Sequence, residues 1–153
     1  MAMLFFGAGL ISWFSIEAAI LSRLRTLTPL PQGERGIIGI QMAPPFVGGN
    51  AYLAANGGTV DWSFLVLTGY GILQLIFLMR LLPWTLEGGF SMSMWGFSFG
   101  MGAMVSTGVH LSAAGVLNPL GIVLMAIGTG FLVFLWGGVA YVASQGRLLV
   151  GRR

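Results

Sequence analysis

Five long apolar segments alternate with four short polar gaps along this chain. The segments cover residues 1–21, 36–57, 62–82, 89–113 and 120–143. Each has close to the roughly 20 residues that an α-helix needs to cross the hydrocarbon core of a bilayer. The pattern predicts an all-α, polytopic membrane protein, with five spanning helices in one transmembrane domain and a basic cytoplasmic tail at 144–153.

The basic residues fall only in alternate gaps, at the mouth of the third gap in the case of Arg80, and in the tail. They are Arg23, Arg25, Arg35, Arg80, Arg147, Arg152 and Arg153. The positive-inside rule then places these gaps and the C-terminus in the cytoplasm and the N-terminus outside. The formal net charge of +3 is explained by arginines beside lipid headgroups, and no nucleic-acid partner is expected.

The second segment, 36–57, is the least regular of the predicted helices. Pro44 and Pro45 stand near its middle, where a proline pair removes backbone hydrogen bonds and forces a kink or break. Gln41 and Asn50 add amides to the apolar zone. Two interpretations stay open here: a kink packed against small residues, or a helix that lines a polar pathway.

The fourth segment combines small polar residues and glycines with two central aromatic side chains. Phe97 and Phe99 flank Ser98, and Gly100 follows, a composition that suits a helix facing other helices or water. Its methionines are interpreted as packing residues, because the chain lacks cysteine and its single histidine, His110, lies near the extracellular end of the helix. No metal and no cofactor is expected.

Two acidic residues occupy informative positions. Glu17 lies inside the first segment, where a carboxylate is expected to pair with an arginine of another helix, or alternatively to relay protons or contact substrate. Asp61 directly precedes the third segment and is expected to cap it. The third segment, 62–82, is apolar on all sides and is expected to face lipid.

The inventory of reactive side chains argues against an enzyme. The chain has one histidine, four acids and no cysteine, and the acids lie in separate segments or loops, so no pair for acid–base or nucleophilic catalysis is evident. A pathway lined by hydroxyls, amides and backbone, with almost no fixed acid, disfavours selection of cations by carboxylate rings. It permits anions.

Four stretches resemble the C-terminal half of the tellurite-resistance/dicarboxylate transporter (TehA-like) family, which shares a superfamily with the plant slow-type anion channels. In order they are GLISWFSIEAAILSRLR, GIQMAPPFVGGNAYLAANGG, GYGILQLIFLMRLLPW and SMWGFSFGMGAMVSTGVHL. The resemblance implies ten helices in five hairpins around a pore, a homotrimer in the bacterial inner membrane, and conduction of small anions such as chloride and nitrate. The five segments would be helices six to ten, with 36–57 and 89–113 as inner pore helices.

The resemblance also implies site residues, because a phenylalanine on the ninth helix closes the pore of family members. It points to Phe99 as the gate, with Phe97 as second choice. The positions expected to line the pore or kink its helices are Gln41, Pro44, Pro45, Asn50, Ser98 and Gly100. Many relatives have proline where this chain has Gly100, so a softer kink is expected.

Five helices would supply only two of the five inner helices of such a pore. A missing N-terminal half, in cis or in trans, is therefore expected as a partner, together with the lipid bilayer. Two alternatives remain: a proton-coupled carrier of C4-dicarboxylates or tellurite, with Glu17 as the proton site, and a non-transporting remnant or scaffold.

Overall fold

A computed structural model gives the fold and describes residues 1–26 and 28–146. The regular structure within these ranges is entirely helical, which confirms the all-α prediction. The elements are α1 (Ala2–Thr26), η1 (Gln32–Met42), α2 (Ala43–Asn56), α3 (Trp62–Leu86), η2 (Met92–Phe97), α4 (Ser98–Ala113) and α5 (Asn118–Ser144), where η marks a 3-10 helix. Arg147, Arg152 and Arg153 of the expected basic tail, and the Arg25 side chain, lie outside what the structure describes.

Three helices of the described chain are long and apolar enough to cross a membrane without interruption: α1 (over Ala2–Arg23), α3 and α5. The other two predicted segments are composite. In each, a 3-10 helix leads directly into an α-helix, η1 into α2 and η2 into α4. A 3-10 helix of 11 residues such as η1 is uncommon, because such runs rarely exceed 3–4 residues.

The proline pair lies at the start of α2 and not inside a continuous α-helix. Pro44 and Pro45 occupy the first turn after Ala43, where backbone N–H groups have no partner within an α-helix and a missing N–H removes no α-helical hydrogen bond. The irregularity expected from these prolines takes the form of a change in helix type at Met42.

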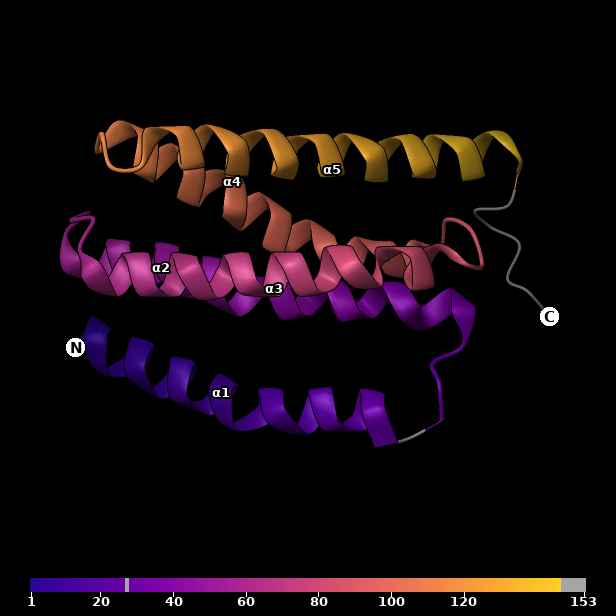
Figure 1. The fold of residues 1–153 in the computed structure, drawn as a ribbon, viewed down its shortest axis with the longest axis horizontal. Helices are drawn as coiled ribbons and strands as arrows, with labels where there is room; N and C mark the ends of the chain where they lie inside the picture. The colour runs from indigo at the N-terminus through magenta and orange to yellow at the C-terminus, as the bar shows by residue number, and fades with distance from the viewer. Residues whose placement is uncertain (27, 147–153) are drawn as a thin grey trace.

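The chain after α1 folds into two hairpins of the same construction (Figure 1). One consists of η1, α2 and α3, the other of η2, α4 and α5. The composite helices of the two hairpins run parallel and in step. The backbone N–H of Gly36 donates to Ser93 Oγ at 3.1 Å and the Thr107 hydroxyl donates to Asn50 Oδ1 at 3.3 Å, and each bond joins residues 57 positions apart.

Glycines allow the two hairpins to approach at backbone distance. A β-carbon at Gly36 would lie 2.4 Å from the Met94 backbone nitrogen, and one at Gly96 would lie 2.9 Å from the Gly36 carbonyl oxygen. Real β-carbons are not found this close to backbone atoms, so side chains are excluded at these positions. The contact is of the kind that small residues make between membrane helices.

Arg35 ties the first polar gap to the third. Its guanidinium lies 2.5 Å from Glu87 Oε2, donates to the carbonyl oxygens of Trp84 at 3.0 Å and Leu30 at 3.1 Å, and stacks 4.6 Å from the centre of the Trp84 ring. Figure 1 shows both gaps at one end of the bundle, opposite the α2–α3 and α4–α5 turns. The arginine pattern of the sequence requires the first and third gaps to lie on the same side of the membrane, and the structure places both at the same end.

Asp61 caps α3, as predicted. Its Oδ1 accepts hydrogen bonds from the backbone nitrogens of Ser63 at 3.0 Å and Phe64 at 3.1 Å, while the Tyr52 hydroxyl donates to Oδ2 at 2.5 Å. The bond from Tyr52 is the largest influence on the pKa of Asp61 and lowers it; desolvation opposes this effect, and the backbone bonds from Phe64 and Ser63 add to it, so that the pKa lies below its ordinary value.

Glu17 anchors α1 to α3 through an amide. The carboxylate is buried and accepts a hydrogen bond from Gln74 Nε2, which also donates to the Tyr70 hydroxyl at 2.7 Å. Gln74 therefore takes the place of the arginine partner expected from the sequence. The rest of α1 is largely exposed, with 6% of its most apolar window buried.

Candidate functional site

A shallow hollow lies on the surface where α2 and α4 meet. Its volume is about 360 Å³, and the hollow contains no ionisable side chain. The lining residues are Val47, Asn50, Ser98, Phe99, Gly102 and Ala103. Three of the positions expected from the sequence, Asn50, Ser98 and Phe99, are thus brought together from two helices.

Asn50 is held in place by α4. Its Nδ2 donates to the Ala103 carbonyl oxygen at 2.9 Å, and its Oδ1 accepts the 3.3 Å bond from Thr107. The Thr107 hydroxyl is also 3.1 Å from the Ala103 carbonyl. Because both ends of the amide are bonded, Asn50 presents a fixed dipole at the hollow.

The two phenylalanines have different environments. Phe99 is 66% exposed at the hollow, whereas Phe97 is fully buried. The Phe97 ring lies 5.1 Å, centre to centre, from Phe131 of α5 and packs on Gly39 of η1. Phe97 is therefore a core residue, and Phe99 is the aromatic residue exposed at the hollow.

The remaining expected positions lie beneath this surface. Gln41 and Pro45 are buried, Pro44 is half-buried, and none of the three lines the hollow. Gln41 is fully buried, and its amide has no hydrogen-bond partner among the described residues. Gly100 is also buried, and a β-carbon there would lie 3.0 Å from the Ala43 nitrogen, so Gly100 serves the contact between α4 and the start of α2.

The hollow is part of a longer exposed surface along both composite helices. Its exposed members are Ile37, Ile40, Ala51 and Ala54 on η1 and α2, and Met92, Phe99, Val109 and His110 on η2 and α4. These positions carry no carboxylate and no arginine, but Glu34 is exposed three residues before Ile37, on the same face of η1 and at the end of this surface. We call this the inner surface.

Sequence reasoning missed several residues of the inner surface. Val47, Gly102 and Ala103 line the hollow, but they are apolar or small and carry no chemical signal. Their spacing was the available clue: Val47 precedes Asn50 by one helical turn, and Gly102 and Ala103 follow Phe99 by one turn.

Comparison with known proteins gives two matches. The chain matches the family model SLAC1, voltage-dependent anion channel, over residues 1–143. It is also 44% identical over 119 residues to the tellurite resistance protein TehA homolog of Haemophilus influenzae. That alignment covers 78% of this chain and 36% of the relative, so the chain spans little more than a third of the length of the curated relative it matches.

Proposed function

Because the chain belongs to the voltage-dependent anion channel family, we propose that it forms part of a transmembrane channel for small anions such as chloride and nitrate. The match confirms the predicted family resemblance, and the apolar helices make this an integral membrane protein. The observation that carries the proposal is the inner surface, an uncharged strip over two parallel helices with Phe99 exposed near its centre.

The distribution of carboxylates supports anions over cations. Glu17 is buried against Gln74 between α1 and α3, Asp61 caps α3, and Glu87 is paired with Arg35. None of these three groups lines the hollow, and neither does the fourth acid, Glu34, which is exposed in the first turn of η1. At the hollow, a pathway would offer a passing ion amide, hydroxyl and backbone dipoles but no fixed negative charge, and carboxylate rings are the usual means of selecting cations.

Phe99 is the proposed gate. Its ring is bulky, uncharged and exposed, and such a ring closes a narrow pathway by excluding water. Gly102, one turn further along α4, has no atom within 4 Å of where its β-carbon would stand, so there is space beside the ring into which it can turn. Phe97, packed against Gly39 and Phe131, has no such space.

The chain contributes two hairpins to the proposed pore. The relative is about three times as long as the aligned part, and the inner surface is where further hairpins of an N-terminal half would complete a pore wall. We propose a homotrimeric assembly in the bacterial inner membrane, with the end that carries Arg23, Arg35 and Arg80 in the cytoplasm and the N-terminus outside.

Anion flux tests the proposal. The chain, joined to or co-expressed with the N-terminal half, would be reconstituted in liposomes, and chloride and nitrate currents would be recorded. Phe99→Ala should raise the current. Phe5→Ala, which removes a ring that is 78% exposed on α1 and away from the hollow, should leave it unchanged. Absence of anion current even with Phe99→Ala would contradict the proposal.

A proton-coupled carrier for dicarboxylates or tellurite is the second candidate. The observation that favours it is the buried carboxylate of Glu17 in a membrane helix, bonded to a neutral amide, because intramembrane acids often mark proton pathways. Uptake driven by a pH gradient and lost in Glu17→Gln would support this function. Uptake indifferent to both the gradient and the substitution would exclude it.

A further inference from the structure

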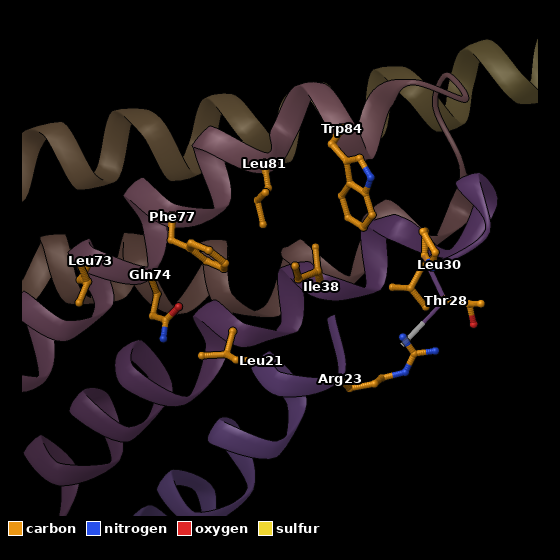
Figure 2. Close-up of a pocket in the computed structure, with 11 residues that line it drawn as sticks. Leu21, Arg23, Thr28, Leu30, Ile38, Leu73, Gln74, Phe77, Leu81 and Trp84 are labelled. Carbon is orange, nitrogen blue, oxygen red and sulfur yellow. The ribbon is translucent and has the colours of Figure 1, made fainter. Parts of the chain in front are cut away.

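A groove of about 790 Å³ separates α1 from α3 at the arginine-bearing end of the bundle (Figure 2). Its lining is apolar except for Arg23, Thr28 and Gln74. Figure 2 shows Arg23 beside Thr28 at one end of the groove and Gln74 near Leu73 toward the other. The groove shares no lining residue with the hollow between α2 and α4.

The groove exists because α1 contacts the bundle along only part of its length. Near its N-terminus, Phe6 packs 5.6 Å from the Tyr52 ring, centre to centre, and Glu17 is bonded to Gln74. Toward its C-terminal end α1 lies farther from the rest of the bundle, as Figure 1 shows. Leu21 and Arg23 of this part of the helix form one wall of the groove.

The opposite wall is a row of bulky side chains on α3. Leu73, Phe77 and Leu81 are spaced four residues apart and therefore lie on one face of the helix. Leu73 is 61% exposed and Phe77 is 37% exposed. Apolar side chains this accessible, in a space this large between two membrane helices, require an apolar occupant.

We propose that this groove binds an anionic phospholipid, with an acyl chain along Leu73, Phe77 and Leu81 and the headgroup phosphate at Arg23. The charge of the site favours a phosphate, because Arg23 is the one charged side chain among the lining residues that the structure describes, and no described carboxylate is paired with it. Basic residues at the membrane end of such pockets attract anionic lipids. Trp84 lines the same end, and tryptophan is enriched at headgroup depth.

The lining also argues against a water-soluble ligand. Sites for such ligands combine apolar walls with a few polar groups that fix orientation. The amide of Gln74 is already committed to Glu17 and the Tyr70 hydroxyl. Arg23 and the Thr28 hydroxyl, at one end of the groove, remain to hold a polar group, which is the arrangement that a lipid headgroup with a trailing chain fits.

The test is lipid retention. The protein, purified in the full length in which it is expressed, would be equilibrated in nanodiscs of phosphatidylcholine containing phosphatidylglycerol, and bound lipid would be counted by native mass spectrometry. The unsubstituted protein should retain phosphatidylglycerol preferentially. Arg23→Gln should lower this retention about fivefold, the value of one arginine at an anionic surface. Arg80→Gln, the same charge change at an exposed arginine outside the groove, should not.

A second variant tests the groove itself. Leu73→Trp adds volume at an accessible position, so it should fold and displace the retained lipid while Arg23 is intact. Equal loss of retention in Arg23→Gln and Arg80→Gln would indicate general surface charge and overturn the proposal. So would a Leu73→Trp protein with unchanged lipid retention and an altered number of chains in the assembly, because the occupant would then be protein.

Discussion

Gly39 of η1 lies against the ring of Phe97, the last residue of η2: a β-carbon at Gly39 would stand 2.2 Å from Phe97 Cδ2. The ring is itself fully buried between the two hairpins and Phe131 of α5. This contact joins the hairpins at the level where both composite helices approach their change from 3-10 to α-helix. It also separates Phe97 from the inner surface.

Gly39→Ala should therefore destabilise the protein. The added methyl group has no room unless the buried Phe97 ring moves, and overpacking of this kind costs about 1–3 kcal/mol. Thermal unfolding in detergent micelles measures the loss. Gly102→Ala is the matched control, because nothing lies within 4 Å of the added β-carbon there; a Gly39→Ala protein as stable as Gly102→Ala would contradict the packing described.

Truncation of Phe97 and of Phe99 should change the stability of the protein by very different amounts. Phe97→Ala should lower the free energy of unfolding by about 3–5 kcal/mol, the usual cost of emptying a buried aromatic site. Phe99→Ala removes a ring that is 66% exposed and should have a small effect on stability. Chemical unfolding of both variants in the same micelles compares them, and equal losses would mean that Phe99 is also a packing residue.

Gln74→Leu should lower the free energy of unfolding more than Glu17→Gln does, because it weakens the packing of α1 on α3. The leucine leaves the buried Glu17 carboxylate without its bonded amide, and an unsatisfied buried group costs about 1–3 kcal/mol, or more when charged. Glu17→Gln keeps a group that can still bond to Gln74. The double variant Glu17→Leu, Gln74→Leu should lose less stability than the sum of the single leucine variants, and additive losses in a thermodynamic cycle would refute the coupling.

Acid should weaken the cap of α3. The pKa of Asp61 lies below its ordinary value of 3.8 because the Tyr52 hydroxyl and the backbone of Phe64 and Ser63 bond to the carboxylate. A lowered folded-state pKa adds stability that is fully present above the unfolded-state pKa, near pH 4, and is lost as pH falls through the folded-state value. Thermal unfolding between pH 6 and roughly pH 2.5 measures this loss. Tyr52→Phe should reduce the pH dependence, and an unchanged profile would contradict the assignment.

Arg35→Gln should cost more stability than Glu87→Gln. Glu87 is an exposed partner, and its removal should cost less than about 1 kcal/mol, as for other surface ion pairs. Arg35 also donates to the carbonyl oxygens of Leu30 and Trp84, and losing these bonds adds about 0.5–1.5 kcal/mol each. Equal melting temperatures for the two variants would show that the carbonyl bonds contribute little.

The hydrophobic pattern was sufficient to predict the all-helical class, and together with the arginines it predicted that the first and third gaps lie at the same end of the bundle. Bilayer thickness fixes the length of a spanning segment, and the arginines in alternate gaps required the first and third gaps to share one end, where Arg35 is found bonded to Glu87. The cap at Asp61 followed from its position before Trp62 and its side-chain chemistry.

The long 3-10 stretch of η1 and the parallel pairing of the hairpins were not predictable from this pattern. A 3-10 helix and an α-helix bury similar apolar residues, so composition does not separate them, and the glycines that permit close approach reveal their partners only in three dimensions. Gln41 illustrates the limit: the sequence places an amide in an apolar segment, but only the fold shows that this side chain is fully buried and does not line the hollow.

The environments of Phe97 and Phe99 were likewise not predictable from the sequence, because they depend on contacts with distant elements. Two residues apart on a helix, their side chains point to nearly opposite sides, so the two rings do not share one surface. Which ring faces the core depends on Gly39 and Phe131, from elements far away in the chain.

The bonds of Arg35 can form early in synthesis of the chain. Its partners Leu30, Trp84 and Glu87 are all translated before η2 begins at Met92. The first hairpin can therefore close its arginine-bearing end while the second hairpin is still in the ribosome, and it needs no residue of its twin to do so. Membrane insertion of this protein can proceed one finished hairpin at a time.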